Sequence, residues 1–163
     1  MNYGNLYYED FEVGRRYPMG SRRITLEDHL SFCKMVGYEI PIFVGPDKNV
    51  RPDPASVICP SHLIMSFTSP LAGQLFANTL IGLVALDKAR FHRNVRPGDT
   101  LRTEVEVVTK RESSKPGRGL VTFRDLVYNQ HDELVFQNDK TAMIRCRQTT
   151  DRPTGQTVPA SGQ

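Results

Sequence analysis

The sequence predicts an α+β domain in which a curved antiparallel sheet is wrapped around a long buried helix. Three observations predict this class. An amphipathic helical pattern occupies residues 26–36, a more apolar helical pattern begins near residue 60, and the second half of the chain changes to strand-like alternation between turn clusters. The chain has 163 residues, 39% of them hydrophobic, which is the size and composition of one compact domain with one core.

The first predicted elements are a strand and a helix. Residues 15–24 form the candidate strand, and Thr25 follows it with the pattern of a helix N-cap that has carboxylates in the next turn. Apolar side chains then recur at spacings of three and four, which gives one buried stripe. We therefore expect a helix over 26–36, ended by Gly37.

Residues 37–58 are predicted to form an irregular loop. Prolines remove the backbone donors that a regular element needs. A loop of this length inside a compact domain is uncommon unless it forms a lid or a binding surface, so we expect a functional site here. The prolines are Pro41, Pro46, Pro52 and Pro54.

A second helix is predicted to begin at Pro60, whose missing amide hydrogen costs nothing in a first turn. Pro70 removes one hydrogen bond farther along, so we expect a kink or a restart near Ser69. The apolar spacing predicts that this helix is largely buried. Its apolar positions are Leu63, Ile64, Phe67, Leu71 and Leu75.

Four further strands are predicted in the second half of the chain. Polar turn clusters or loops separate several of them, so neighbouring strands should be antiparallel. A curved antiparallel sheet wrapped around the buried helix covers both the helix and one sheet face, an arrangement known as the hot-dog fold. The predicted strands are 80–90, 103–109, 120–128 and 134–146, and the turns or loops are 96–99, 113–119 and 129–132.

We expect residues 1–148 to form a single hot-dog domain. Residues 149–163 collect Thr, Pro, Gly, Ser and Gln with almost no large apolar side chains. Such a composition cannot build a core, so this segment is predicted to be a flexible C-terminal tail.

Composition excludes several functional classes. Lys plus Arg exceeds Asp plus Glu by only 3 (21 against 18), too small a surplus for a nucleic-acid footprint. No apolar run approaches the roughly 20 residues that cross a bilayer, and the first residues lack the pattern of a secretory signal. We therefore expect a cytoplasmic protein that binds neither nucleic acid nor a membrane.

Metal and nucleophile motifs are absent from the sequence. The three cysteines are far apart, which fits neither a disulfide framework nor a metal knuckle, and the four histidines show no metal-ligand spacing. Neither a Gly-rich phosphate loop nor a Gly-x-Ser-x-Gly segment occurs. We expect no metal site, and we expect His29 and His131 to be structural or exposed.

Four segments carry a resemblance to a known family. Residues 8–14, 24–28, 95–101 and 127–130 resemble those of the MaoC-like hydratase and dehydratase family of hot-dog proteins, and the similarity spans roughly residues 7–147. The turn Pro97-Gly98-Asp99-Thr100 with its flanking strands is the most specific piece. The resemblance implies activity on acyl-coenzyme A thioesters, with no cofactor besides the thioester substrate.

The family implies a particular catalytic pair. An Asp and a His five residues later, in the form Gly-Asp-x-Asn-Pro-x-His, add water to an enoyl thioester or remove it from a 3-hydroxyacyl thioester. The chemistry needs a base for water while the thioester carbonyl carries enolate charge. A carboxylate, an imidazole and an amide at a helix start must therefore converge.

This sequence departs from that motif at both catalytic positions. Gly37 and Pro41 match, but Tyr38 stands in the place of the Asp and Phe43 in the place of the His. Phe has no titratable group, and an unperturbed Tyr with a pKa of about 10 is a poor base. The usual pair is absent, and the divergent loop resembles a half of mesaconyl-CoA hydratase-type proteins more than the short enoyl-CoA hydratases.

By this resemblance, Glu39 and His62 are the candidate catalytic residues, and Tyr38, Ser61 and Arg93 are the candidate substrate-binding residues. A helix start disfavours protonation of an imidazole and keeps it available as a base. The alternatives remain open: Glu39 can point into water from a loop, and His62 can serve only to satisfy backbone groups.

Basic residues near the Pro-Gly-Asp-Thr turn and beside the 113–119 loop are candidates for holding the phosphates of coenzyme A. The alternative is a solvated charged face, because Lys and Arg are common on surfaces. The two groups are Arg90, His92 and Arg93, and Lys110, Arg111, Lys115 and Arg118.

The expected function is hydration or dehydration of an enoyl or 3-hydroxyacyl thioester by a divergent active site. The alternatives are a catalytically inactive hot-dog subunit or acyl-CoA-binding module, and an acyl-CoA thioesterase. Hot-dog units pair so that two sheets join edge to edge, which covers exposed strands, so we expect a homodimer or a higher homo-oligomer.

Overall fold

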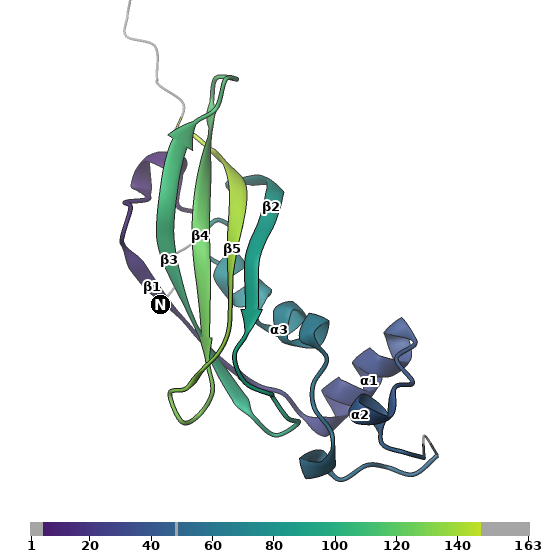
Figure 1. The fold of residues 1–163 in the computed structure, drawn as a ribbon. Helices are drawn as coiled ribbons and strands as arrows, with labels where there is room; N and C mark the ends of the chain where they lie inside the picture. The colour runs from purple at the N-terminus through teal and green to yellow at the C-terminus, as the bar shows by residue number, and fades with distance from the viewer. Residues whose placement is uncertain (1–4, 48, 148–163) are drawn as a thin grey trace, which may run out of the picture.

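The computed structural model describes residues 5–47 and 49–147, which form one antiparallel sheet and a small set of helices (Figure 1). The predicted tail, 149–163, lies outside the described residues and stays a prediction. No helix in the described part of the chain is both long and apolar enough to cross a membrane.

Five strands make up the sheet, in the order β1-β3-β4-β5-β2. All neighbouring pairs are antiparallel, as the sequence predicts. Strands β1 and β2 are therefore the two edges, and β2 pairs with the last strand rather than with the one that follows it in sequence. The strands are β1 (Arg16–Arg23), β2 (Leu80–Phe91), β3 (Thr100–Glu112), β4 (Arg118–Tyr128) and β5 (Leu134–Arg145).

The first helix, α1 (Leu26–Val36), has the predicted boundaries. Thr25 Oγ1 accepts from the amide of Asp28 at 3.0 Å, and the Asp28 carboxylate accepts in return from the amide of Thr25 at 3.0 Å. This reciprocal cap satisfies two amides that the helix cannot satisfy itself. Gly37 ends the helix with a φ of 75°, a backbone conformation that favours glycine.

The segment 37–58 is more regular than predicted. It contains the short helix α2 (Pro41–Val44) and the 3-10 helix η2 (Pro54–Ser56), each with a proline in its first turn. The prediction of an irregular loop is wrong here because a proline at a helix start loses no hydrogen bond. A further 3-10 helix, η1 (Tyr8–Asp10), precedes β1.

Helix α3 (Ser61–Gly73) lies against one face of the sheet and contacts β1, β3 and β4 (Figure 1). Pro60 is its N-cap, and the helix is continuous through Pro70, so the restart does not occur; the kink near Ser69, the other predicted outcome, stays a prediction. Tertiary packing supplies the reason, because the sheet side of the helix is buried on both sides of the proline. The buried side chains are Leu63, Ile64, Thr68 and Ala72.

The core divides into two clusters along the sheet. One surrounds Phe123, whose ring packs edge-on against Phe11 at 5.0 Å between centroids. The other surrounds Leu63 near the start of α3 and includes Val127 and Phe136. Each fully buried side chain of this size contributes about 1.5–3 kcal/mol to folding, so the second cluster anchors the start of α3.

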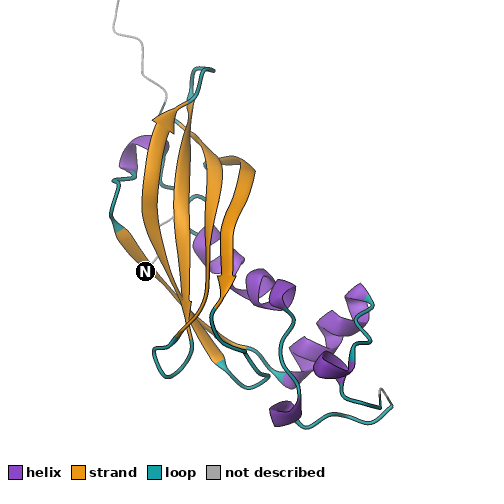
Figure 2. Ribbon diagram, viewed as in Figure 1, coloured by secondary structure: helices purple, strands orange, loops and turns teal. Residues whose placement is uncertain are grey.

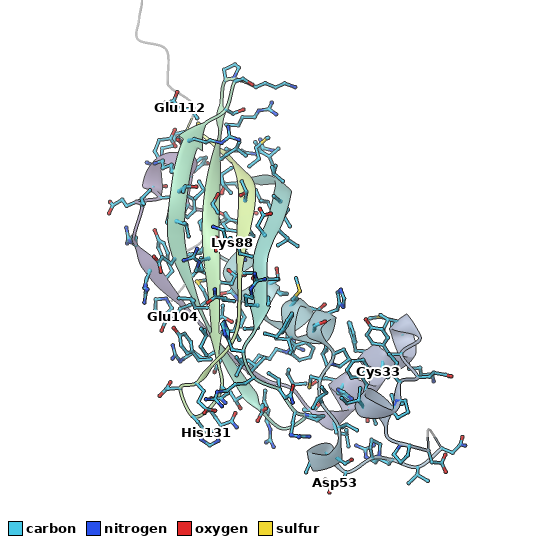
Figure 3. The ribbon with its side chains drawn as sticks, in the orientation of Figure 1. Cys33, Asp53, Lys88, Glu104, Glu112 and His131 are labelled. Carbon is cyan, nitrogen blue, oxygen red and sulfur yellow. The ribbon has the colours of Figure 1, made fainter. Side chains whose placement is uncertain are left out.

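The helices α1 and α2 gather at one end of the sheet, opposite the hairpin that joins β3 to β4 (Figure 2). In Figure 3, Cys33 and Asp53 mark the helical end and Glu112 marks the opposite hairpin. The 37–58 segment, in which we expect a functional site, therefore lies beside the start of α3 and away from the hairpin.

Candidate active site

A cavity lies between the start of α3 and the end of β2, and we call it the seam cavity. Its volume is about 220 Å³. Ser61 and Ile64 supply its α3 wall, and Phe43 comes from the helical end of the molecule. The other lining residues are Ile58, Cys59, Phe91, Arg93, Asn94 and Val95.

The start of α3 presents amides to this cavity. The amides of Leu63 and Ile64 donate to the Pro60 carbonyl, at 3.0 and 3.3 Å. Those of Ser61 and His62 have no acceptor among the described residues. Free amides at a helix start carry partial positive charge, so they can stabilise an oxyanion that develops on a thioester carbonyl.

His62 follows Ser61 in the first turn of α3, and its side chain is exposed. Its Nδ1 lies 3.3 Å from the hydroxyl of Tyr38 and 3.5 Å from the hydroxyl of Ser61. These contacts hold one side of the imidazole against the 37–58 segment. Its Nε2 has no partner in the part of the chain that the structure describes, which leaves that nitrogen open to a bound water or substrate.

Aromatic rings occupy the two positions where the family motif has its Asp and His. The rings of Tyr38 and Phe43 lie 5.4 Å apart, and Phe32 packs on the other side of Tyr38 at 6.5 Å. Phe43 lines the seam cavity itself. The wall that carries the family's imidazole is therefore apolar in this chain.

His29 on α1 holds the backbone of Phe43 in place. Its side chain is fully buried, and its Nε2 lies 2.6 Å from the carbonyl oxygen of Phe43. Because a carbonyl only accepts, Nε2 donates this bond. The structural role expected for His29 is confirmed, and His131 is exposed, as expected.

Glu39 lies in a different cavity, which we call the loop cavity. This cavity has a volume of about 340 Å³ and is also lined by Tyr38, Cys33 and Val50. Neither Glu39 nor His62 lines the seam cavity. Of the predicted site residues, the structure brings Ser61 and Arg93 together at the seam cavity and joins Tyr38 to His62 by a hydrogen bond. Glu39 lines the loop cavity together with Tyr38.

Arg93 is the predicted basic residue that reaches the seam. It pairs with Glu133 at 3.3 Å and keeps 58% of its side chain exposed. Lys115 and Arg118 belong to the β3–β4 hairpin at the opposite end of the sheet (Figure 1). The two basic groups singled out from the sequence are thus far apart, and only the group at 90–93 lies beside the cavity.

The thiol in the seam cavity is a poor nucleophile. Burial raises the pKa of Cys59 to about 12, with a smaller contribution from Asp99. A thiol with this pKa stays protonated near neutral pH, and the thiolate is the reactive form. No cluster of three or more His, Cys, Asp or Glu side chains within 5–47 and 49–147 has the geometry of a metal site.

Sequence reasoning missed two features of the site region. One is the apolar wall at Phe43, whose position in the cavity follows only from the fold. The other is a buried ion pair between Asp125 on β4 and Lys140 on β5. A charged residue in register with core side chains of a strand was the available signal for the pair.

Comparison with known proteins identifies the relationship. No family model matches the chain. A 3-hydroxyacyl-[acyl-carrier-protein] dehydratase FabZ of Solibacter usitatus is 31% identical over 137 residues, which is 77% of this chain and 80% of that protein. The chain belongs to the MaoC and FabZ family of hot-dog dehydratases and hydratases. A mesaconyl-CoA hydratase of Cereibacter sphaeroides is also 31% identical, over 65% of this chain and 30% of its own length.

Solved structures of MaoC-like proteins have the same fold. An Archaeoglobus monoamine oxidase regulatory protein superposes with a TM-score of 0.74 at 25% identity, over 90% of this chain and 98% of that one. A MaoC domain protein dehydratase of Chloroflexus aurantiacus gives 0.78 at 23% identity, over 98% of this chain and 46% of that one. The predicted hot-dog fold and the MaoC resemblance are both confirmed.

Proposed function

We propose that this MaoC-like protein hydrates an enoyl thioester of coenzyme A or dehydrates the corresponding 3-hydroxyacyl thioester. The free amides of Ser61 and His62, at the start of a buried helix and beside a cavity, carry this proposal. The activities of the relatives, a 3-hydroxyacyl-[acyl-carrier-protein] dehydratase and a mesaconyl-CoA hydratase, support the same reaction class.

The proposed chemistry uses groups at the start of α3, where Ser61 lines the seam cavity. The thioester carbonyl accepts from the amides of Ser61 and His62, which stabilise the enolate as water adds to the β-carbon. His62 takes a proton from that water and returns a proton to the α-carbon, so water adds across the double bond and no cofactor is consumed. Tyr38 holds the imidazole, because its hydroxyl contacts Nδ1 at 3.3 Å.

Glu39 and Arg93 complete the proposed site. Glu39 is proposed as the second acid-base group, because it directly follows Tyr38, the residue that contacts His62. Arg93 lines the seam cavity with an exposed guanidinium, which can pair with a phosphate of coenzyme A.

A homodimer through β2 is part of this proposal. Strand β2 is a sheet edge whose large apolar side chains stay between 40% and 55% exposed. An exposed, apolar strand edge pairs readily with a second strand, and a two-fold axis makes the contact self-complementary. The exposed residues are Leu80, Ile81, Leu83, Val84, Leu86 and Phe91.

A non-catalytic hot-dog subunit is the second candidate function. One observation favours it: Tyr38 and Phe43 pack together where the family has its acid-base pair. The chain also spans only 46% of the Chloroflexus MaoC domain protein and 48% of a double hot-dog protein of Mycobacterium tuberculosis. A chain of this kind would bind the thioester while a second hot-dog unit supplies the catalytic groups.

The decisive experiment measures hydration of crotonyl-CoA and a branched enoyl-CoA by loss of the enoyl-thioester absorbance. We expect turnover by the full chain, and a fall in kcat of about 10² or more for His62→Gln and for Glu39→Gln. His131→Gln and Glu27→Gln are matched controls at exposed positions and should leave kcat unchanged.

Three results would contradict parts of this proposal. Hydration that survives both His62→Gln and Glu39→Gln would show that the residue assignment is wrong. Binding of acyl-CoA without turnover would favour the non-catalytic subunit. Thiol release from saturated acyl-CoA without hydration would favour a thioesterase.

A further inference from the structure

Residues 55–60 lead into α3, and we call them the entry segment. The segment begins in the 3-10 helix η2 and ends at Pro60, the N-cap of α3. Its last four residues belong to no helix or strand. Backbone groups outside a regular element must find their hydrogen bonds elsewhere, so the partners of these groups decide what holds the start of α3.

Arg96 supplies two of these hydrogen bonds. Its Nη1 donates to the carbonyl oxygen of Ala55 at 2.7 Å and to that of Val57 at 2.9 Å. A single guanidinium nitrogen therefore joins two carbonyls of the entry segment. The guanidinium stays charged in proteins, and a hydrogen bond from a charged donor is about twice as strong as one between neutral groups.

Main-chain hydrogen bonds complete the hold on the entry segment. The amide of Cys59 donates to the carbonyl of Val95 at 2.7 Å. The amide of Ile58 donates to the carbonyl of Ile42 at 3.0 Å. Because backbone groups of alternate residues point to opposite edges of an extended chain, residues 55, 57 and 59 bond on one edge and residue 58 on the other.

The turn that carries Arg96 is itself fixed by hydrogen bonds. The amide of Arg96 donates to Oδ2 of Asp99 at 2.8 Å, and Nε2 of Gln130 donates to Oδ1 of the same carboxylate at 2.8 Å. The amide of Ile24 donates to the carbonyl of Asp99 at 2.9 Å. The backbone of Arg96 is therefore anchored to the end of β1 and to the loop between β4 and β5.

Pro60 transmits the position of the entry segment to the helix. Its ring restricts φ, which is −57° here, and the residue before a proline is confined to extended conformations. The link from Val57 to Ser61 is therefore stiff. A displacement of the Val57 carbonyl would move the amides of Ser61 and His62, because few free torsions lie between them.

Apolar packing does not by itself orient the entry segment. Val57 and Cys59 are buried, and Cys59 belongs to the same core cluster as Leu63. Burial of apolar surface is non-directional, so it favours depth in the core over one orientation of the backbone. Hydrogen bonds prefer particular angles, so the two bonds from Arg96 add the orientation that packing lacks.

We propose that Arg96 is a positioning residue for the amides at the start of α3. Through the entry segment, it holds these amides in the orientation that stabilises the enolate. This inference rests on the proposed function, which puts the thioester carbonyl at the amides of Ser61 and His62. A displacement of about 1 Å caused by a substitution remote from the chemistry can lower a rate about 10²-fold.

Binding of acetoacetyl-CoA to the full chain reports on these amides directly. This ester ionises to an enolate that absorbs in the near ultraviolet, so a site that stabilises the oxyanion raises the ratio of bound enolate to bound neutral ester at a fixed pH. Arg96→Met removes the donors and keeps the apolar stem. We expect it to lower this ratio about tenfold, while the affinity for butyryl-CoA, which does not ionise, changes less than about threefold.

Hydration kinetics give a second readout. Loss of an interaction that acts mainly in the transition state lowers kcat and leaves KM nearly unchanged. We therefore expect Arg96→Met to lower kcat for crotonyl-CoA about 10–100-fold, with KM within about twofold. A residue that served only to stabilise the fold would change the thermal midpoint and leave the enolate ratio of the folded protein as it was.

Arg23→Met is the matched control. Nε of Arg23 donates to the carbonyl of Gly98 at 3.2 Å, in the same turn, and none of its bonds within the described residues reaches the entry segment. This variant removes one bond between an arginine and a carbonyl, and it should leave the enolate ratio and kcat unchanged.

Arg96→Lys keeps the test valid if Arg96→Met does not fold. The variant retains the charge, but its ammonium ends one covalent bond short of Nη1, so the bonds to Ala55 and Val57 cannot both keep their lengths. We expect the enolate ratio to fall by about threefold or more, in parallel with kcat.

The outcomes separate this inference from the proposed function. An enolate ratio left unchanged by Arg96→Met, or by Arg96→Lys where the methionine variant does not fold, would overturn the inference and leave the proposed function standing. An equal fall for Arg23→Met would also overturn it, because any loss from the turn would then have the same effect. An unaltered chain that neither forms the bound enolate nor hydrates crotonyl-CoA would overturn the proposed function itself.

Discussion

The hydroxyl of Tyr38 lies 3.3 Å from Nδ1 of His62, so the residue in the family's aspartate position contacts the side chain at the start of α3. Two residues 24 positions apart in sequence are thus joined at the start of α3. The contact links the 37–58 segment, which lacks the family's Asp and His, to the imidazole of His62. Within the described residues, this is the imidazole beside the free amides at the start of α3.

Removing this hydroxyl tests its positioning role. Tyr38→Phe keeps the ring that packs on Phe43 and removes only the bond to His62. We expect kcat for hydration to fall about fivefold, the value of one ordinary hydrogen bond, with KM and the thermal midpoint nearly unchanged. Tyr128→Phe is the control, and an equal fall there would show that Tyr38 has no special role.

The buried imidazole of His29 should matter for stability rather than chemistry. His29→Leu removes the donor to the Phe43 carbonyl, which then lacks its 2.6 Å partner. We expect the free energy of unfolding to fall by about 1–3 kcal/mol, measured by urea denaturation. His131→Leu, at an exposed turn, should change it by less than about 0.5 kcal/mol.

Asp139 should make folding sensitive to acid. The hydrogen bonds from Arg124 lower the pKa of this carboxyl, Lys88 adds to the effect, and burial opposes it. A lowered folded-state pKa adds stability above the unfolded value of about 3.9, and that stability is lost as the pH falls through the folded value.

The variant Asp139→Asn should therefore be less stable than the unaltered chain at neutral pH. The difference between the two free energies of unfolding should shrink as the pH drops below about 4, because the carboxyl is then protonated in both states. Asp53→Asn, at an exposed loop position, is the control. A difference that does not change with pH would contradict the ionic role of Asp139.

The exposed edge of β2 should control assembly. A lysine in place of Leu83 or Leu86 puts a charge on an apolar strand edge, so we expect analytical ultracentrifugation to show a shift from dimer to monomer. Met35→Lys changes an equally apolar, exposed residue on α1 and should leave the dimer intact. A monomeric unaltered chain would refute the proposed dimer.

Local signals explain why much of the fold could be predicted. Thr25 and Gly37 fix the two ends of α1 through contacts within a few residues, so the predicted boundaries are confirmed. The pairing of β2 with β5 joins distant segments, and alternation alone carries no information on strand order. The prediction of an irregular loop over 37–58 is wrong in detail, because Pro41 and Pro54 begin short helices instead of preventing them.

The candidate site was less predictable than the fold. The family motif located Tyr38 and Phe43, but only the folded chain shows that Glu39 faces a cavity other than that of Ser61. Lys140 has the same parity as Phe136 and Ile144 in β5, a signal of its buried position that the sequence prediction did not use. Cavities form between elements distant in sequence, so no local pattern reports them.

A crystal structure of the chain with butyryl-CoA, which keeps the thioester carbonyl but has no double bond to hydrate, tests the central claim most directly. The account predicts the acyl carbonyl oxygen about 2.7–3.1 Å from the amide nitrogens of Ser61 and His62, with the acyl chain directed along α3. An acyl carbonyl found away from these two amides, for example at the β3–β4 hairpin, would contradict it.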